Sequence, residues 1–544
     1  MKLISFLFGI SRQTVILSTL ASIISGASSI GLIMVINIAL DETVVSQSLL
    51  AWSFAGLCLL RLLASIASRL LLAKLGQEAI FNLRLRLSRQ ILATPLRDLE
   101  EVGTHRLLAA LTSDTSALMG ALTAIPTLSL NAIIVLGSMA YLAWISWSVA
   151  LAALSFIILG IITYRLPIIR AHYYFKKARE TEDALFQHFR ALTEGVKELK
   201  LHFQRRLTFI SDVLRPTAAD LKEHFTSGIT VYAVAGSWGN LLFFIFIGLL
   251  VFALPLIVNS ERQDLISYTL IILFMMTPLQ TILSAFPSLG QANVSLKKLE
   301  ALGLSITVDS EGRNGLSQSN GLTKPNPMPA WQRLNLTGVT HTYQREGSDH
   351  TFTLGPIDLT FCRGELVFLI GGNGSGKTTL AKLLTGLYTP KVGEISLDEK
   401  SIYKEEISLE TYRQLFSVIF ADFYLFDSFL GLDKPNLDVR AHNYLAKLQL
   451  DHKVHARNGA LSTTELSQGQ RKRLALLVAY LEDRPFYVFD EWAAEQDVPF
   501  REFFYTEILK DLQGRGKTVL VITHDDKYYH LADRIIKLEY GQLV

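Results

Sequence analysis

The sequence predicts a multidomain protein in which an all-α membrane domain with six transmembrane helices is fused to an α/β domain. The chain has 544 residues, which is too many for a single hydrophobic core. Half of its residues are hydrophobic and only 19% are charged. The hydrophobic residues are concentrated before about residue 300, in long uncharged runs. The remainder contains short apolar runs and glycine-rich turns typical of a globular α/β domain.

Five uncharged or nearly uncharged stretches supply the six predicted spans, because a helix needs about 20 apolar residues to cross the hydrocarbon core. One of them is long enough for two helices, and Trp144 and Trp147 near its middle indicate a hairpin at a water interface. The first stretch is too long for a cleaved signal peptide, so we expect it to remain. The stretches are residues 13–40, 49–72, 115–164, 226–260 and 265–294.

The charges of the loops predict the orientation of the spans. The loops after the second and fourth spans are rich in Lys and Arg, whereas the loop after the first span has Asp41 and Glu42 and no basic residue. The positive-inside rule therefore puts both long loops and both termini in the cytoplasm. Helical periodicity over residues 80–92 and 173–201 indicates that the membrane helices continue into the cytoplasm.

Composition excludes two classes of protein and locates a linker. A net charge of +3, with no Lys/Arg cluster among aromatic residues, argues against a nucleic-acid partner. The two cysteines, Cys58 and Cys362, do not suggest a disulfide framework. Residues 307–329 are rich in Ser, Gly, Asn and Pro, as linkers are. We therefore divide the chain into a transmembrane domain at 1–304, a linker at 305–330 and a globular domain at 331–544.

A glycine-rich loop predicts a nucleotide site in the globular domain. An apolar, strand-like run at residues 366–370 precedes it, and a helix-like run follows it. Glycines let backbone N–H groups turn towards phosphates, Lys377 reaches the β- and γ-phosphates, and the Thr378 hydroxyl binds Mg²⁺. The predicted cofactors are therefore ATP and Mg²⁺. The loop residues are Gly371, Gly372, Asn373, Gly374, Ser375, Gly376, Lys377, Thr378 and Thr379.

Three further segments fit ATP hydrolysis. The run 486–489 delivers Asp490, which we expect to bind Mg²⁺, and Glu491, which we expect to orient or deprotonate the attacking water. Ser467 precedes the helix-like run 471–481 and marks a second anion site. A further strand-like run, 519–523, ends at His524.

These motifs, in this order, resemble an ATP-binding-cassette (ABC) ATPase, and six spans ahead of one cassette resemble a type IV ABC exporter half-transporter. The resemblance implies a homodimer through both the membrane and the ATPase domains, or a paired half-transporter. It also implies a short helix near residues 95–100 that docks on the cassette. By position, the implied ATP contacts are Tyr343 on the adenine, His524 on the γ-phosphate, Asp497 between the two sites, and Ser467, Gly469 and Gln470 on the partner's nucleotide.

Departures from the usual cassette indicate a branch of the family. Ala421 stands where most cassettes have glutamine, so Asp422 is the candidate for the contact with Mg²⁺ and water. Residues 489–497, 523–528 and 193–201 resemble the bacterial cyclic-peptide and siderophore exporters of the pyoverdine and syringomycin type. The resemblance implies ATP-driven export of a cyclic or non-ribosomal peptide, a siderophore or its precursor, across the bacterial inner membrane.

Three other functions fit the same motifs: import of a siderophore, transport of lipids or multiple drugs, and regulation or self-immunity without transport. The cargo site is the least determined part of the sequence. Aromatic, methionine and small residues of the fifth and sixth spans are candidates either for a cargo pocket or for helix packing. They are Ala233, Ala235, Gly236, Gly239, Phe243, Phe244, Phe246, Met275 and Met276.

Overall fold

The structure is a computed structural model that describes residues 12–40, 46–257, 262–301, 330–344, 351–403, 408–432 and 435–544. The chain forms two compact units. The first comprises Met1–Ala93 and Val102–Ser310, and the second comprises Thr94–Glu101 and Glu311–Val544. The predicted linker at 305–330 lies outside the described residues except for its last one.

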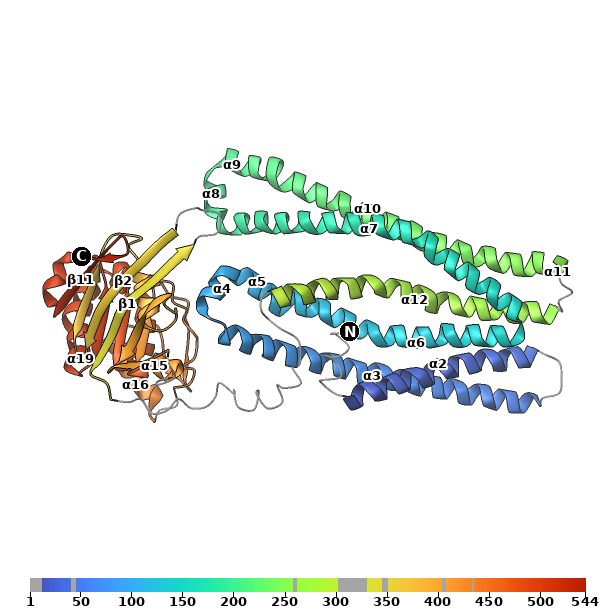
Figure 1. The fold of residues 1–544 in the computed structure, drawn as a ribbon, viewed down its shortest axis with the longest axis horizontal. Coiled ribbons are helices and arrows are strands. Elements are labelled where there is room, and N and C mark those ends of the chain that lie inside the picture. Colours follow the sequence, from blue (N-terminus) through green and yellow to red (C-terminus); the bar gives the residue numbers. More distant parts are fainter. Residues whose placement is uncertain are drawn as a thin grey trace. The chain divides into compact units, whose positions relative to one another are not determined.

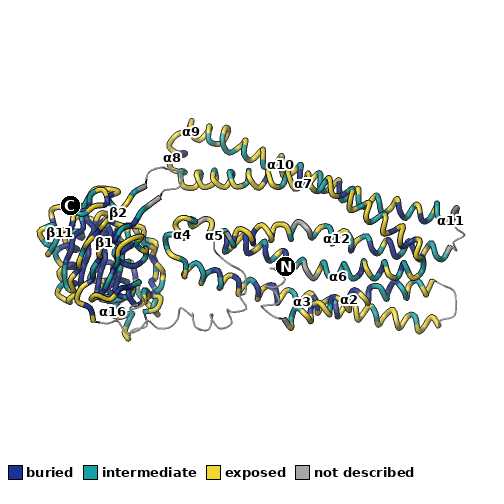
Figure 2. Tube along the Cα trace, viewed as in Figure 1, coloured by how far each residue is buried: buried dark blue, intermediate teal, exposed yellow. Residues whose placement is uncertain are grey.

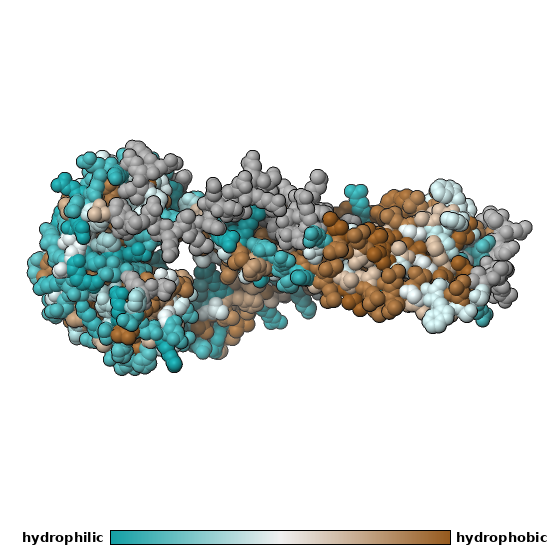
Figure 3. Space-filling model, turned by 90° about the horizontal axis from the view of Figure 1, so that it is seen from below, coloured by the Kyte–Doolittle hydropathy of each residue, from teal (hydrophilic) through white to brown (hydrophobic). Residues whose placement is uncertain are grey.

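The first unit is all-α, and six of its helices are long and apolar enough to cross a membrane (Figure 1). Their apolar surface forms the brown area in Figure 3. The main helices of the six spans are α2 (Arg12–Leu40), α3 (Gln47–Ala93), α6 (Thr115–Ile145), α7 (Trp147–Glu194), α10 (Arg215–Gly248) and α12 (Arg262–Ala301). Shorter segments connect or extend them: α5 (Thr104–Ala109), η1 (Ala110–Asp114), α8 (Val196–Leu201), α9 (Phe203–Thr208), η2 (Phe209–Leu214), η3 (Leu249–Ala253) and α11 (Leu254–Ile257).

The predicted division of residues 115–164 is confirmed at Ser146. This residue is extended, with φ −153°, and its hydroxyl accepts a hydrogen bond from the Val149 N–H as the N-cap of α7. Trp144 and Trp147 on either side are exposed. The predicted helix extensions are also confirmed, because α7 has 48 residues and spans about 70 Å, more than twice the hydrocarbon thickness.

The long helices of the first unit pack in pairs, and burial is confined to the seams between them (Figure 2). Helix α2 packs along α3, where the hydroxyls of Ser22 and Ser68 are 2.8 Å apart. Helix α12 packs along α6, and α7 packs along α10. The Ser295 hydroxyl donates to the buried Asp114 carboxylate over 2.8 Å, which ties α12 to η1.

The second unit is an α/β domain built on a mainly parallel six-stranded sheet of order β12-β11-β3-β10-β9-β6. Its strands are β3 (Leu366–Ile370), β6 (Phe416–Ile419), β9 (Phe486–Asp490), β10 (Thr518–Ile522), β11 (Arg534–Glu539) and β12 (Gln542–Leu543). A second sheet contains β2 (Thr351–Cys362), β1 (Arg333–Gln344), β4 (Val392–Leu397) and β5 (Lys400–Ser401), and β7 (Ala456–Arg457) pairs with β8 (Ala460–Leu461).

The helices of the second unit cover this sheet. They are α14 (Lys377–Leu384), α15 (Leu409–Arg413), α16 (Leu437–Lys447), α17 (Gln468–Glu482), η4 (Trp492–Glu495), α18 (Val498–Phe503), η5 (Phe504–Ile508), α19 (Leu509–Gly514) and η6 (Asp526–Leu531). Strands β9 and β10 are buried along their whole length. Because β3, β10 and β9 are parallel neighbours, the loops that follow them meet at one edge of the sheet.

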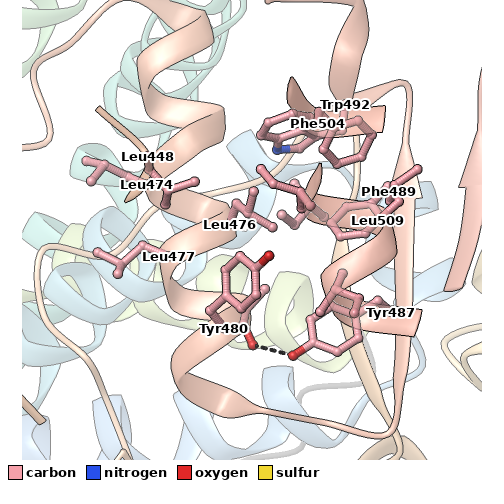
Figure 4. Packing of buried hydrophobic residues seen from close by; sticks show 14 of the residues in the cluster. Leu448, Leu474, Leu476, Leu477, Tyr480, Tyr487, Phe489, Trp492, Phe504 and Leu509 are labelled. Carbon is pink, nitrogen blue, oxygen red and sulfur yellow. Dashed lines mark hydrogen bonds between the residues drawn. The ribbon is translucent and has the colours of Figure 1, made fainter. Parts of the chain in front are cut away.

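A large apolar cluster joins α17 to β9 (Figure 4). Leu476 and Tyr480 of α17 point towards Phe489 and Tyr487 of β9, and the Tyr487 hydroxyl donates to the Ala479 carbonyl over 3.2 Å. This packing fixes the position of one helix against the strand that precedes Asp490 and Glu491.

A short helix from the first long loop belongs to the second unit, as the family resemblance implied. Helix α4 (Leu96–Val102) packs Leu96 against an apolar cluster of that unit. The Glu100 carboxylate accepts a hydrogen bond from the Lys382 ammonium over 2.8 Å and another from the Tyr388 hydroxyl. Lys382 lies on α14, the helix that begins at Lys377.

The contact of Glu100 generates a prediction about the order of α4. Glu100→Ala removes both acceptors and leaves the mostly buried Lys382 without this carboxylate. We expect amide hydrogen exchange of residues 96–101 to accelerate at least tenfold, because each of the two charge-assisted hydrogen bonds contributes about 1.5–3 kcal/mol and about 1.4 kcal/mol is a factor of ten. Glu101→Ala is the control, since Glu101 is exposed and its ion pair among the described residues is with Arg97 of the same helix. Equal exchange in both variants would contradict the docking role of Glu100.

Candidate active site

The glycine-rich loop joins β3 to α14 at the carboxyl edge of the sheet. Gly371 has φ +150°, and a Cβ built there would lie 2.0 Å from the Leu538 carbonyl oxygen. Gly376 has φ +102° and is the N-cap of α14, in the left-handed region that favours glycine. The loop can therefore take this path only with glycine at these two positions.

Lys377 and Ser375 make the loop an anion site. Lys377 is 6% exposed, and its ammonium donates to the carbonyl oxygens of Gly371 and Gly372, each over 2.9 Å. Burial lowers the pKa of Lys377, and the nearby carboxylates of Glu491 and Asp490 oppose that shift. The Ser375 hydroxyl is buried and has no hydrogen-bond partner among the residues that the structure describes. A phosphate group would satisfy this hydroxyl and compensate the lysine charge, so the residues present fit a nucleotide phosphate.

Asp490 lies at the end of β9, beside the loop. It is 1% exposed, and its carboxylate accepts a hydrogen bond from the Thr378 hydroxyl over 2.9 Å. Burial raises the pKa of Asp490, Thr378 and Lys377 oppose the shift, and the negative charges of Glu491 and Asp422 add to it. The pair of Thr378 and Asp490 is therefore a candidate cation site, and without a cation its carboxylate is desolvated and uncompensated.

These oxygen atoms fit Mg²⁺ only in part. Among the residues that the structure describes, no group of three His, Cys, Asp or Glu side chains is placed to hold a metal ion. Asp422 lies in the exposed loop after β6 and acts on Asp490 only through its charge. Since Mg²⁺ prefers few protein carboxylates, several waters and substrate phosphates, the donor set suits an ion that arrives with a nucleotide.

Glu491 follows Asp490 and has a φ of +49°, in the left-handed region that non-glycine residues rarely adopt. Its N–H donates to the Ile522 carbonyl of β10 over 3.1 Å. The His524 Nε2 atom lies 3.5 Å from its carboxylate. The strained turn at Glu491 aims a carboxylate next to the loop, and sites of this kind are often functional.

Lys472 of α17 is the site residue that the sequence reasoning missed. It is 1% exposed, and its ammonium donates over 2.9 Å to the backbone carbonyl of Glu491. In return, the Trp492 indole N–H donates to the Lys472 carbonyl over 2.9 Å. No residue type in the sequence marks this contact, because its acceptor is a backbone carbonyl.

The segment that begins at Leu466 and leads into α17 forms a surface of the unit different from that of the glycine-rich loop. Ser467 is the N-cap of α17, yet its hydroxyl makes no capping hydrogen bond. Ser467 and Gln470 line an open concavity together with Lys453, Thr464, Glu465, Leu466 and Arg471, and none of the glycine-rich loop residues lines it. Gly469 is close to the turn after Glu491, because a Cβ on it would lie 2.7 Å from the Glu495 carbonyl oxygen.

Asp497 connects α17 to the turn after Glu491. Its carboxylate pairs with the Arg473 guanidinium, which also donates to the Gln496 side chain over 2.9 Å. Gln496 in turn donates to the Gly469 carbonyl over 2.9 Å. These bonds hold Asp497 beside α17, with its carboxylate exposed.

The structure thus brings together Lys377, Thr378, Asp490, Glu491 and His524, and places Ser467, Gly469, Gln470 and Asp497 around the start of α17. Asn373 and Thr379 lie in the loop and in the first turn of α14. Tyr343 lies in β1, paired with Phe352, but its side chain is outside the described ones. Phe352, which the sequence reasoning did not single out, has its ring 3.2 Å from a Cβ built on Gly376.

Fold and site define a membrane-bound ATPase, and the chain belongs to the ABC transporter family. Residues 354–494 match the ABC transporter model, and residues 14–279 match that of the ABC transporter transmembrane region. The six spans with one cassette form a type IV ABC exporter fold, whose ATP hydrolysis is coupled to transport. The family, the fold class and the enzyme class predicted from the motifs are confirmed.

Individual relatives cover nearly the whole chain. The chain is 38% identical over 96% of its length to the ATP-binding protein SyrD of Pseudomonas syringae pv. syringae, of which it covers 93%. It is 25% identical over 93% of its length to an ATP-dependent lipid A-core flippase of Thiobacillus denitrificans, covering 87% of it. A bacterial Atm1-family ABC exporter with ATP bound has a similar fold, with a TM-score of 0.78, 15% identity and coverage of 98% and 95% of the two chains.

The contact of Lys472 predicts a kinetic effect. In Lys472→Met the Glu491 carbonyl loses its donor, so the carboxylate is less well positioned. We expect kcat for ATP hydrolysis to fall about tenfold to a hundredfold, because small displacements of a catalytic group cost this much, while KM for ATP stays nearly constant. Lys510→Met, on the exposed face of α19, is the control. An unchanged kcat would mean that Glu491 keeps its position without Lys472.

The raised pKa of Asp490 predicts how stability depends on pH. Because the folded pKa exceeds the unfolded one, the nucleotide-free protein loses stability as pH rises through the folded pKa. Asp490→Asn removes this loss, so its melting temperature without nucleotide should exceed that of wild type by about 2–4 °C near pH 8. The difference should shrink towards about pH 4, where Asp490 is protonated.

Thermal unfolding of the purified full chain checks this expectation, with Asp526→Asn, an exposed carboxylate, as the control. ATP with Mg²⁺ should stabilise wild type and the control but not Asp490→Asn. A variant that melts below wild type near pH 8 would contradict the proposed cost of the buried carboxylate.

Proposed function

We propose that the chain is a homodimeric exporter of a cyclic or non-ribosomal peptide, a siderophore or its precursor, in the bacterial inner membrane. The homodimer is supported by the positions of two candidate half-sites, which lie on separate surfaces of one unit. One half contains the phosphate loop with Asp490 and Glu491, and the other contains Ser467 and Gln470. Two copies related by a two-fold axis would complete two sites, since a two-fold interface repeats the same contacts.

The peptide cargo is supported by similarity alone. The relative SyrD matches over 96% of the chain, and the segments 489–497, 523–528 and 193–201 resemble those of the cyclic-peptide and siderophore exporters. The basic loops support cytoplasmic termini and a cytoplasmic ATPase unit. The lipid A-core flippase relatives favour a second candidate, export of a lipid.

The proposed mechanism assigns each residue a task. The amides of residues 371–376 and Lys377 bind the triphosphate, and Tyr343 stacks on the adenine. Thr378 and Asp490, with Asp422 nearby, would hold Mg²⁺, which neutralises phosphate charge. Glu491 takes the proton of the attacking water, and His524 donates to the γ-phosphate oxygen.

Transport would follow from the affinity of ATP for the closed pair. Ser467, Gly469 and Gln470 of one copy contact the phosphates held by the other, so bound ATP favours the dimer of cassettes. Asp497 lies between the two sites in that dimer. Closure shifts the population of the membrane helices towards the outward-open state, and hydrolysis returns it.

Glu491→Gln tests the catalytic assignment. Without the carboxylate, no base is present to take the proton, so ATPase activity should fall by about 10²–10⁴-fold while ATP binding persists. Glu507→Gln, at an exposed position of η5, should hydrolyse ATP like wild type. Hydrolysis at the wild-type rate in Glu491→Gln would overturn the assignment of the base.

Mass spectrometry of cells and medium tests the cargo. A deletion strain would be complemented with wild type, Glu491→Gln or Glu507→Gln. A peptide or siderophore that is absent from the medium and accumulates in cells in the deletion and in Glu491→Gln, but not in Glu507→Gln, supports export. Accumulation of a lipid instead would support the second candidate and exclude the peptide.

A further inference from the structure

A cavity of about 230 Å³ lies inside the first unit, between α7, α10 and α12. Its deep end is formed by buried apolar side chains, among them Phe246, Ile272 and Met275. The Phe156 ring lies against the Phe246 ring, with centroids 4.7 Å apart. An apolar cavity of about 150 Å³ is large enough to take up benzene, so this one has room for a larger hydrocarbon group.

The polar residues of the cavity gather at its other end. Ala153 and Tyr164 both line it from α7, so it extends over about 16 Å along that helix. On the Tyr164 side, Asn240 and Gln280 are hydrogen-bonded to each other, and Gln280 and Ser284 are exposed at the mouth. None of the described residues that line the cavity carries a charge. The shape therefore suits a ligand with a hydrocarbon tail and a neutral polar group.

Glycines create much of this space. Gly236 and Gly239 line the cavity, and a Cβ built on either would meet no atom within 4 Å. Elsewhere in the unit, glycines allow close packing: a Cβ on Gly137 would lie 2.0 Å from Ile30, and one on Gly228 would lie 2.9 Å from Phe175. Within one copy of the chain, close packing therefore does not explain Gly236 and Gly239, although each costs about 1 kcal/mol relative to alanine in a helix.

This result separates the candidate residues of the fifth and sixth spans. Phe243, Phe246, Met275, Gly236 and Gly239 line the cavity. The other four candidates, Ala233, Ala235, Phe244 and Met276, do not line it. The first group is therefore the one that bears on ligand binding.

We infer that this cavity binds the uncharged hydrocarbon tail of an amphiphile, whose neutral amide or hydroxyl group faces Asn240 and Gln280. This step rests on the proposed export function: the amphiphile is the cargo. The cargo then has an apolar tail, and any charged groups it carries lie outside this cavity. An acyl chain of a membrane lipid has the same chemistry and is the other source of such a tail.

Photolabelling of the purified full-length protein in nanodiscs tests this inference. The probe is an N-alkyl acetamide of about ten carbons with a diazirine near the chain end, and its adducts are mapped by mass spectrometry. We expect adducts on α7, α10 and α12, and about tenfold less labelling in Gly236→Leu and Gly239→Leu. Gly248→Leu is the matched control, because Gly248 also has no atom within 4 Å of a built Cβ, lies on α10 and does not line the cavity.

Two further probes distinguish the alternatives. A carboxylate with the same chain and diazirine should not label the cavity, and a phospholipid with the diazirine in its acyl chain should be displaced by the amide. Equal labelling in Gly236→Leu and Gly248→Leu, or equal labelling by the carboxylate, would overturn the site. Labelling by the phospholipid that the amide does not displace would overturn the cargo assignment.

The labelling needs neither ATP hydrolysis nor secretion, so its outcome is independent of the export experiment. Labelling without any peptide in the secretion assay would refute the peptide cargo and leave the hydrocarbon site standing. Peptide secretion without labelling would refute the hydrocarbon site and leave the export function standing.

Discussion

The hydrogen bond from Lys472 to the Glu491 carbonyl is the constraint on which the ATPase site depends. It fixes Glu491, a site residue with a strained backbone. Its donor lies on α17, the helix that begins after Ser467. The apolar packing of α17 on β9 supports the same junction from below (Figure 4). The same helix thus follows Ser467 and carries the lysine that holds the Glu491 carbonyl.

The site is also a place where folding and function oppose each other. Lys377 and Asp490 are both nearly fully buried. Burial lowers the pKa of Lys377 and raises the pKa of Asp490, which in each case favours the neutral form. The buried Ser375 hydroxyl lacks a partner among the described residues. A nucleotide with its cation would relieve all three, so part of the free energy that burying these groups costs becomes available as binding energy.

Much of this arrangement could be predicted from the sequence, because it depends on local chemistry. The spans follow from the lengths of the apolar runs, the break at Ser146 from two closely spaced tryptophans within a run too long for one span, and the phosphate loop from glycines between a strand and a helix. The sites that depend on tertiary packing could not be predicted. Lys472 contacts a carbonyl 19 positions further along the chain, and a backbone acceptor leaves no mark on residue types.

The membrane cavity shows the same limit. The sequence contains Gly236 and Gly239 but does not tell whether a glycine admits a neighbouring helix or leaves a space. Only the distances from a built Cβ decide this, and they differ between Gly236 and Gly137. The candidate residue Tyr343 remains a prediction, since its side chain is outside the described residues.

Helix α14 connects the phosphate loop to α4 within the second unit. Its first residue, Lys377, belongs to the phosphate loop, and Lys382 on the same helix holds Glu100 of α4. The two residues are about 7.5 Å apart along one stiff rod. A displacement of the loop that carries α14 with it would therefore be passed to α4 through the contact of Lys382 with Glu100.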